Sequence, residues 1–222
     1  MRTIRTLTVA AAVIATLPTL AAAQRGRDFK DAWFWGIKTG GLSIANENGG
    51  GVQAPIIGGD WLITRTHGGV YMAASEAFFS QHALTIIDPN FPVDSGFRRI
   101  SLKNLRRFDA LAMGYPGEYK KWHPYVGAGF TLAEIASVRA EGAFSNIDQV
   151  TFTRALIDDG KVAFSPVFMG GAQYRLTYFS IFGQLSLSPA QKHFLLSNGK
   201  AWNFGYEIGF RYNLSSSVDR EN

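Results

Sequence analysis

Histidine is the residue type to inspect first for catalysis, because its side chain serves both as a general base and as a metal ligand. The sequence contains four histidines, and they stand far apart at positions 67, 82, 123 and 193. No His-Glu-x-x-His pattern or other close pair of metal-ligand histidines occurs. Cysteine is absent, which excludes disulfides and thiolate-bound metals. We therefore predict a protein that is not an enzyme and that carries no cofactor and no metal.

Five cationic side chains form a second group with recognisable chemistry. They lie within ten residues of one another: Arg98, Arg99, Lys103, Arg106 and Arg107. Guanidinium groups bind phosphate oxygens in pairs, so this cation cluster could hold phosphate groups at a surface. The alternative is a strand end and loop that simply face water. A nucleic-acid interface is not expected, because no aromatic stacking platform accompanies the cations.

Single charged residues inside strand-like apolar runs form a third group. We assign the following side chains to one interior: Lys38, Asp60, Glu134, Arg175, Glu207 and Arg211, with Glu76 as a further candidate. Isolated buried charges are very costly, so acidic and basic members of this set must pair with one another. Gln173, Gln184 and Asn203 are expected to satisfy the hydrogen bonds that remain. The elements that would bring these residues together are strands.

The clearest strand covers residues 201–214. Its even positions are large and apolar, and its odd positions are polar or small, without exception over fourteen residues. Successive side chains of an extended chain point to opposite faces, so one face is wholly apolar. Strands of soluble proteins are usually about 5–6 residues long, whereas a tilted strand that crosses a bilayer needs roughly 9–11. The segment therefore predicts a membrane-crossing strand with lipid on one side and a lumen on the other.

Seven further runs predict strands of the same kind. They lie near residues 32–45, 54–63, 69–81, 100–115, 124–138, 162–175 and 177–189. Pro166 lies inside the sixth run and removes a ladder donor, so we expect a bulge there or a strand that begins late.

The facing of two runs decides where two of the charged residues point. Near 69–81 the facing is ambiguous, because Tyr71 shares a parity with Ser75, while Val70 shares one with Glu76. Near 124–138 we assign Glu134 to the polar face, together with Gly127, Gly129 and Thr131.

The connections between the eight runs alternate in length. Short ones lie near 64–68, 116–123 and 175–178, and longer ones near 46–53, 82–99, 139–161 and 190–199. Outer-membrane barrels have short periplasmic turns and longer outside loops, so both termini should lie on the periplasmic side. Aromatic residues near the short turns agree with an interfacial girdle. They are Trp33, Trp61, Tyr71, Tyr115, Trp122, Tyr125, Tyr174, Tyr178 and Tyr212.

Residues 1–23 predict a signal peptide that is cleaved before Gln24. Arg2 and Arg5 precede an apolar stretch, and small residues at 21–23 suit cleavage. A helical membrane anchor is the alternative, but the apolar stretch is shorter than the roughly 20 residues that a spanning helix needs. We expect residues 24–31 to be a short N-terminal segment, 32–214 a single barrel and 215–222 a C-terminal tail.

The run from Glu207 to Leu214 resembles the C-terminal insertion signal of bacterial outer-membrane barrels. Gly209, Tyr212 and Leu214 occupy its glycine and hydrophobic positions, although the chain continues to Asn222 instead of stopping on an aromatic residue. In its topology the chain is similar to the small barrels of the OmpW, OmpX and opacity-protein kind. This resemblance implies a location in the outer membrane of a Gram-negative bacterium and insertion by the barrel-assembly machinery. It also implies contact with outer-membrane lipids, and lipopolysaccharide phosphates as ligands of the cation cluster.

The predicted fold is all-β: an eight-stranded antiparallel up-and-down transmembrane β-barrel, closed so that no strand edge faces lipid. Such a barrel is only wide enough for side chains to fill its interior, so we expect a plugged lumen. We expect a monomer that acts in envelope integrity, in surface recognition and adhesion, or in narrow passage of small hydrophobic solutes. The alternative is a soluble periplasmic lipocalin-like barrel, whose apolar face would surround a hydrophobic ligand.

Overall fold

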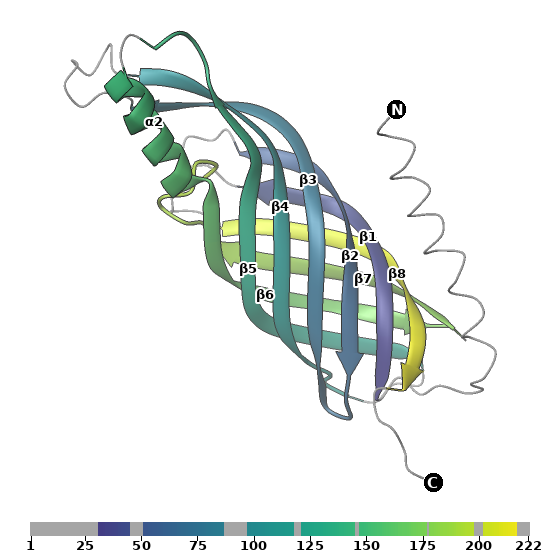
Figure 1. Cartoon of the computed structure of the whole chain (residues 1–222). Coiled ribbons are helices and arrows are strands. Elements are labelled where there is room, and N and C mark those ends of the chain that lie inside the picture. The colour runs from purple at the N-terminus through teal and green to yellow at the C-terminus, as the bar shows by residue number, and fades with distance from the viewer. Residues whose placement is uncertain are drawn as a thin grey trace.

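Eight antiparallel strands close into a barrel in the computed structural model, which describes residues 31–44, 51–86, 97–117, 121–144, 147–176, 178–197 and 202–216. Each strand pairs with its neighbours in sequence, and the last returns to pair with the first (Figure 1). The strands are β1 (Ala32–Ile44), β2 (Val52–Thr64), β3 (Gly68–Ile86), β4 (Phe97–Gly114), β5 (Trp122–Ala140), β6 (Val162–Arg175), β7 (Phe179–Pro189) and β8 (Trp202–Ser216). The predicted fold class is therefore confirmed. The predicted signal peptide at 1–23 lies outside the described residues.

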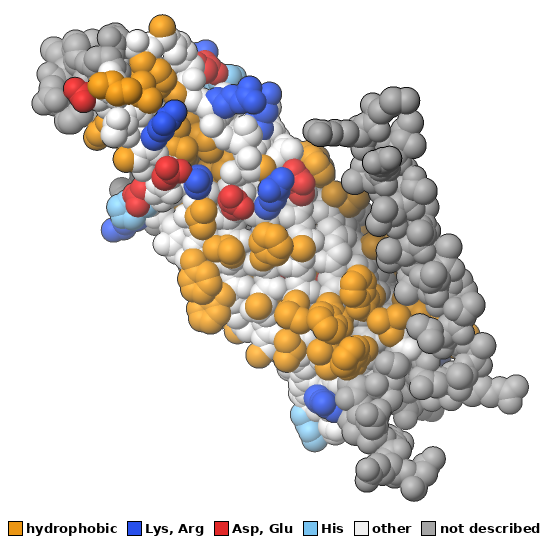
Figure 2. Space-filling view, viewed as in Figure 1, with side chains coloured by type: hydrophobic (Ala, Val, Ile, Leu, Met, Phe, Trp, Pro, Cys, Tyr) orange, Lys and Arg blue, Asp and Glu red, His pale blue; other side chains and the backbone are white. Residues whose placement is uncertain are grey.

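Large apolar side chains cover the outside of the barrel. In β8, every even residue from Trp202 to Phe210 is exposed, and every odd residue from Gly205 to Asn213 is buried. The same alternation on the other strands produces an apolar belt. The belt includes Trp35, Ile37, Ile57, Val70, Phe108, Val126, Phe130, Phe164, Phe168, Ile181, Leu185 and Ile208. Figure 2 shows hydrophobic side chains across one face of the barrel, with charged side chains beyond them. This arrangement is the reverse of a soluble lipocalin-like barrel.

Aromatic residues gather at the short-turn end, as predicted, but three of the predicted set point into the barrel and do not belong to the girdle. Trp33 and Trp61 make an edge contact with ring centroids 5.6 Å apart, at the ends of β1 and β2 next to the first short turn. By contrast, Tyr115 packs against apolar side chains of the interior, and Tyr71 and Tyr125 are buried inside the barrel. Their odd numbers place them on the inward faces of β3 and β5, with Ala73 on the same face of β3.

Three neighbouring strands extend past the others at the long-loop end. β3, β4 and β5 have 19, 18 and 19 residues, whereas the remaining strands have 11–15. Within the extension β3 carries an extra residue between Ala77 and Ser80, and Asn104 on β4 has a φ of 54°. Asparagine is among the residues that tolerate this left-handed conformation. The irregularity interrupts the alternation, so that Leu102 and Leu105 both point inward.

Pro166 is accommodated without a bulge in the β5–β6 ladder. That ladder runs without a register shift from Val162 to Tyr174, but the β6–β7 ladder begins only at Phe168, which pairs with Leu187. Strand β6 therefore begins at Val162 on its β5 side, and only its pairing with β7 begins late, at Phe168. Proline lacks the N–H that a ladder requires and is tolerated where one side of a strand is unpaired.

The long connection between β5 and β6 contains a helix, α2 (Ile147–Gly160), where the sequence predicted only a loop. The helix lies beyond the long-loop end of the barrel (Figure 1). Its end packs closely on the β7–β8 connection, because the Leu195 N–H donates to the Gly160 carbonyl at 2.9 Å. Just after the helix, Lys161 Nζ donates to Asp158 at 2.7 Å, and this hydrogen bond raises the pKa of Lys161. Among the described residues, no helix is long and apolar enough to cross a membrane.

Candidate functional site

The barrel interior is divided into three layers along its axis. At the short-turn end, an apolar layer includes Phe34, Leu62 and Leu111. At the long-loop end, a second apolar layer includes Ile44, Ile100 and Ile135. Between them lies a layer of charged and polar side chains, which we call the interior network.

Arg211 on β8 is the centre of the interior network. Its guanidinium donates to both carboxylate oxygens of Asp60, at 2.9–3.2 Å, and its Nη1 donates to Gln173 Oε1 at 2.8 Å. Its Nη2 also donates to Gln184 Oε1 at 3.3 Å. The centroid of the Phe182 ring lies 3.7 Å from Cζ, so the cation also rests on an aromatic face. The planar fork of arginine is suited to satisfying several acceptors at once.

Lys38 on β1 is the second cation of the interior network. Its Nζ donates to Glu207 Oε2 at 2.9 Å and to the Tyr71 hydroxyl at 3.2 Å. Gln184 Nε2 donates to the same Glu207 oxygen, and also to the Tyr71 hydroxyl at 3.0 Å. Gln184 therefore links the hydrogen bonds around Lys38 to those around Arg211.

Arg107 and Asp109 on β4 complete the interior network. Arg107 Nε donates to Asp109 Oδ1 at 2.9 Å, and its Nη2 donates to Ser186 Oγ at 3.3 Å. The other Asp109 oxygen lies 4.0 Å from Lys38 Nζ. The prediction that Arg107 belongs to a surface cation cluster is therefore wrong. The inward positions of β4 are odd-numbered from Leu105 onwards, and this parity turns Arg107 into the lumen.

Three cations and three carboxylates balance one another in this layer. They are Lys38, Arg107, Arg211, Asp60, Asp109 and Glu207, and all are buried. Neutral partners come from the remaining strands: Tyr71, Tyr125, Gln173 and Gln184. Every strand thus contributes at least one side chain, and the layer crosses the middle of the lumen.

Two acidic residues predicted for the lumen lie on the outer face instead. Glu76, Arg106 and Glu134 are partners in one row across β3, β4 and β5. Arg106 is exposed, and the inward residues of β3 near this row are odd-numbered, so Glu76 points outward. Glu134 has the even parity of Leu132, which is exposed, and its predicted facing is also wrong.

The other predicted residues are placed as follows. Arg175 has inward parity but lies at the short-turn end of β6, half-buried and opposite Ser180. Arg99 and Lys103 are exposed on the outer face of β4, like Arg106. The side chain of Arg98 lies outside the described part of the structure.

The connection between β7 and β8 folds into the long-loop end of the barrel. Residues 190–197 form this plug, and Phe194 and Leu196 in it are 6% and 4% exposed. They pack against side chains that line the outer part of the lumen, which we call the outer chamber. Its lining is Leu42, Ile44, Val52, Ala54, Ile56, Ala77, Ile100, Leu102, Leu105, Ile135 and Ala163. The outer chamber is thus an apolar space filled by the chain's own plug.

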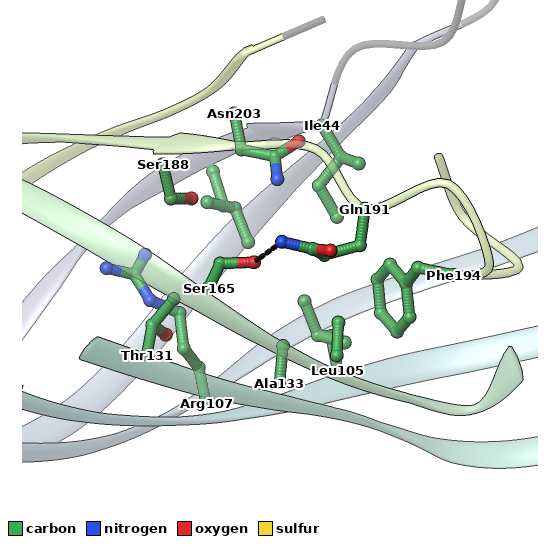
Figure 3. A pocket seen from close by; sticks show the side chains of 12 residues that line it. Ile44, Leu105, Arg107, Thr131, Ala133, Ser165, Ser188, Gln191, Phe194 and Asn203 are labelled. Atoms are coloured by element: carbon green, nitrogen blue, oxygen red, sulfur yellow. Dashed lines mark hydrogen bonds between the residues drawn. The ribbon is translucent and has the colours of Figure 1, made fainter. Parts of the chain in front are cut away.

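A small cavity lies between the plug and the interior network (Figure 3). Its volume of about 30 Å³ suits two water molecules, because one needs roughly 10–15 Å³. The polar residues that line it are Arg107, Thr131, Ser165, Ser188, Gln191 and Asn203. Gln191 of the plug donates to Ser165 Oγ at 3.1 Å, the dashed line in Figure 3. Two buried oxygens in the lining, Thr131 Oγ1 and Asn203 Oδ1, have no hydrogen-bond partner among the described residues.

The alternation of residue types on β4 could have predicted the ion pair between Arg107 and Asp109. Arg107 and Asp109 alternate with Phe108 and Ala110, just as polar and apolar residues alternate in 201–214. The surface cluster predicted for residues 98–107 ignored this alternation and therefore placed Arg107 on the wrong face. Among the described residues, no group of three acidic, histidine or cysteine side chains could hold a metal ion.

No protein-family model matches the chain, and no curated protein is significantly similar to it. Neisserial surface protein A is similar in structure over 81% of this chain and 96% of its own, with 10% identity and a TM-score of 0.53. Outer membrane protein W of E. coli covers 84% of this chain and all of its own, with 13% identity and a TM-score of 0.44. The outer membrane protease OmpT of Escherichia coli covers 86% and 99%, with 14% identity and a TM-score of 0.41. The predicted resemblance to small outer-membrane barrels is confirmed at the level of the fold.

Proposed function

We propose that this protein is a monomeric, non-enzymatic outer-membrane barrel that binds a small hydrophobic molecule in its outer chamber. The observation that carries the proposal is the filling of the chamber. The middle of the lumen is filled by side chains of the strands themselves, whereas the outer chamber is filled by Phe194 and Leu196 of the plug. A connecting segment can leave its place without opening the barrel.

The location in the outer membrane is supported by the outer surface. A belt of large apolar side chains would be unfavourable in water and favourable in lipid. The aromatic contacts at the short-turn end suit one interface, and the charged row of Glu76, Arg106 and Glu134 suits the other. The long-loop end, with the plug and α2, would then face the outside. The insertion signal from Glu207 to Leu214 lies on β8, as it would for insertion by the barrel-assembly machinery.

The interior favours binding over a through-going channel. The interior network stands between the outer chamber and the periplasmic end, so a bound molecule would return outwards or leave sideways into lipid. A sideways route is supported by the wall next to Ser165. From the pair Phe168 and Leu187 toward the long-loop end, the ladder between β6 and β7 does not continue among the described residues. The hydrogen bond from Gln191 to Ser165 spans this place instead.

A disulfide that locks the plug tests the proposed function. Gly160 and Leu195 are neighbours, because a Cβ at Gly160 would lie 2.8 Å from Leu195 Cγ and 2.9 Å from the His193 carbonyl oxygen. Cysteines at 160 and 195 can therefore be joined by a disulfide after a small shift of the plug, and the chain has no other cysteine. We expect 1-octanol to bind wild-type protein in lipid nanodiscs, measured by calorimetry against empty nanodiscs. The oxidised double variant Gly160→Cys/Leu195→Cys should bind about tenfold more weakly, and dithiothreitol should restore binding. Equal binding by the oxidised and reduced forms, or none by wild type, would contradict the proposal.

A second function, recognition of lipopolysaccharide, is favoured by the cations that remain at the surface. Arg99 and Lys103 are exposed on β4 beyond the apolar belt, where Figure 2 shows Lys and Arg side chains. Arg106 stands between Glu76 and Glu134, so its charge is balanced locally. We therefore assign phosphate binding to Arg99 and Lys103 rather than to the whole predicted cluster.

A further inference from the structure

We infer that the molecule bound in the outer chamber is an amphiphile with a carboxylate head group. The head would lie in the cavity next to Arg107, and the apolar tail would take the place of Phe194 and Leu196. This inference rests on the proposed function, because the outer chamber supplies the site for the tail.

The cavity offers hydrogen-bond donors and a single cation. Arg107 uses Nε for Asp109 and Nη2 for Ser186, and Nη1 makes no hydrogen bond or ion pair within the described residues. Arg107 is the one charged residue among the described residues that line the cavity, and no carboxylate lines it. Charge-assisted hydrogen bonds from a guanidinium to a carboxylate are about twice as strong as neutral ones. The lining therefore favours an anionic head group.

Two neutral side chains in the cavity wall can donate hydrogen bonds to such a head. Thr131 Oγ1 is buried without a partner among the described residues, and its hydroxyl can donate to an oxygen placed in the cavity. Asn203 also lines the cavity, in the space between Arg107 and Phe194 (Figure 3), and the N–H groups of its amide can donate to a carboxylate. A buried hydroxyl without a partner is costly, so a ligand that accepts a hydrogen bond from Thr131 is stabilised.

The size and charge of the site favour a carboxylate over a phosphate. A space that suits two water molecules suits the two oxygens of a carboxylate, whereas a phosphate monoester is larger. The three cations and three carboxylates of the interior network already balance. A head group with one charge therefore adds less uncompensated charge than a head group with two.

The tail site begins where the cavity ends. Figure 3 shows Arg107 and Phe194 on opposite sides of the cavity, and Leu42, Ile44 and Leu105 are among the residues that line it. These three aliphatic residues also belong to the outer chamber. A tail that leaves the head in this direction enters the apolar space that the plug fills, so displacement of the plug exposes no net apolar surface once the tail is bound.

The test compares three probes that share parts of the inferred ligand. Sodium octanoate carries head and tail, 1-octanol carries the tail with a neutral head, and acetate carries the head alone. Calorimetry at pH 8 on wild-type protein in nanodiscs should show octanoate binding about tenfold more tightly than octanol, with no measurable acetate binding. Octanol binding without a preference for octanoate would overturn the carboxylate head and leave the proposed function standing. Binding of neither long probe would overturn both.

Variants of the cavity wall separate the head site from the tail site. Asn203→Asp places a negative charge beside the head, so octanoate should bind about tenfold more weakly, while octanol binding changes less than about twofold. Gln53→Glu, an exposed position on β2, adds the same charge elsewhere and should leave both affinities unchanged. If Asn203→Asp does not fold, Thr131→Val carries the test, because it removes one donor at constant shape. Equal octanoate binding by wild type and a folded cavity variant would overturn the assigned head site.

Discussion

Asp60 and Arg211 form their ion pair over Gly36. Gly36 on β1 is the partner of Asp60 on β2 and of Arg211 on β8, so the two charged side chains flank a residue without a side chain. A Cβ at Gly36 would collide with the Asp60 carboxylate and would lie 2.9 Å from Arg211 Cγ. An ion pair between residues 151 positions apart therefore depends on one glycine.

Gly36→Ala is expected to destabilise the barrel. The added methyl group must displace Asp60, Arg211 or both, and overpacking of this kind costs roughly 1–3 kcal/mol. Urea unfolding of the protein in lipid vesicles measures the loss. Gly183→Ala is the matched control, because a Cβ there meets nothing within 4 Å. Equal stability of the two variants would show that the pair can form without the space that Gly36 provides.

Arg211→Met should leave Asp60 as an uncompensated buried charge. Removal of one partner of a buried ion pair costs about 3–5 kcal/mol, and replacement of both partners costs much less. We therefore expect the double variant Asp60→Asn/Arg211→Met to recover most of the stability in the same unfolding measurement. A double variant as unstable as the single one would mean that the loss comes from packing of the guanidinium rather than from the unpaired charge.

The two faces of β8 should respond differently to polar substitution. Ile208→Arg places a charge in the apolar belt and should cost about 2–4 kcal/mol, whereas Asn203→Ser on the inward face should be mild. The heat-induced shift on unheated gels and urea unfolding measure assembly and stability. The assigned facing would be wrong if both substitutions had the same effect.

Planar bilayers should show little or no steady ion conductance from the wild-type protein. The interior network crosses the lumen with side chains from every strand, and its charges are already paired with one another. Single-channel recording is the measurement. A large, stable conductance from the purified monomer would contradict a lumen closed in its middle.

Loss of the surface cations should reduce bound lipopolysaccharide. The double variant Arg99→Gln/Lys103→Gln removes two phosphate ligands from the outer face of β4 and should co-purify with less lipopolysaccharide, measured by phosphate and fatty-acid analysis. Arg154→Gln on α2, another exposed cation, is the control. If the double variant co-purified with as much lipopolysaccharide as the wild type, Arg99 and Lys103 would simply face water and bind no phosphate.

The barrel could be predicted because its determinants are local. Strict alternation from 201 to 214 assigns each residue of β8 to lipid or to lumen, and connection lengths then order the strands. The helix α2 was missed because its buried face carries the polar residues Gln149 and Thr153, whereas Ile147 and Phe152 are exposed. Ile157 packs against the outer chamber, but one apolar residue makes no helical stripe in the sequence. Packing at the end of the helix, at Gly160, depends on a contact with Leu195, and no pattern in the sequence predicts that contact.

The interior site was predictable in composition but not in pairing. Parity placed Lys38, Asp60, Glu207 and Arg211 in the lumen, where the structure has them. Which carboxylate meets which cation depends on the register of strands far apart in sequence, as with Asp60 and Arg211 on either side of β1. The cavity and plug were beyond prediction, because a connection such as 190–197 has no periodicity that shows it folding inwards.

The seam between β1 and β8 joins the first strand made during synthesis to the last. Two ion pairs depend on this seam: Lys38 with Glu207, and Asp60 with Arg211. A chain that stops before β8 would hold Lys38 and Asp60 inside a half-built sheet with neither of these partners. Neutralisation of the interior and closure of the ring are therefore a single event. Incomplete intermediates are penalised twice, once for an open strand edge in lipid and once for stranded charge.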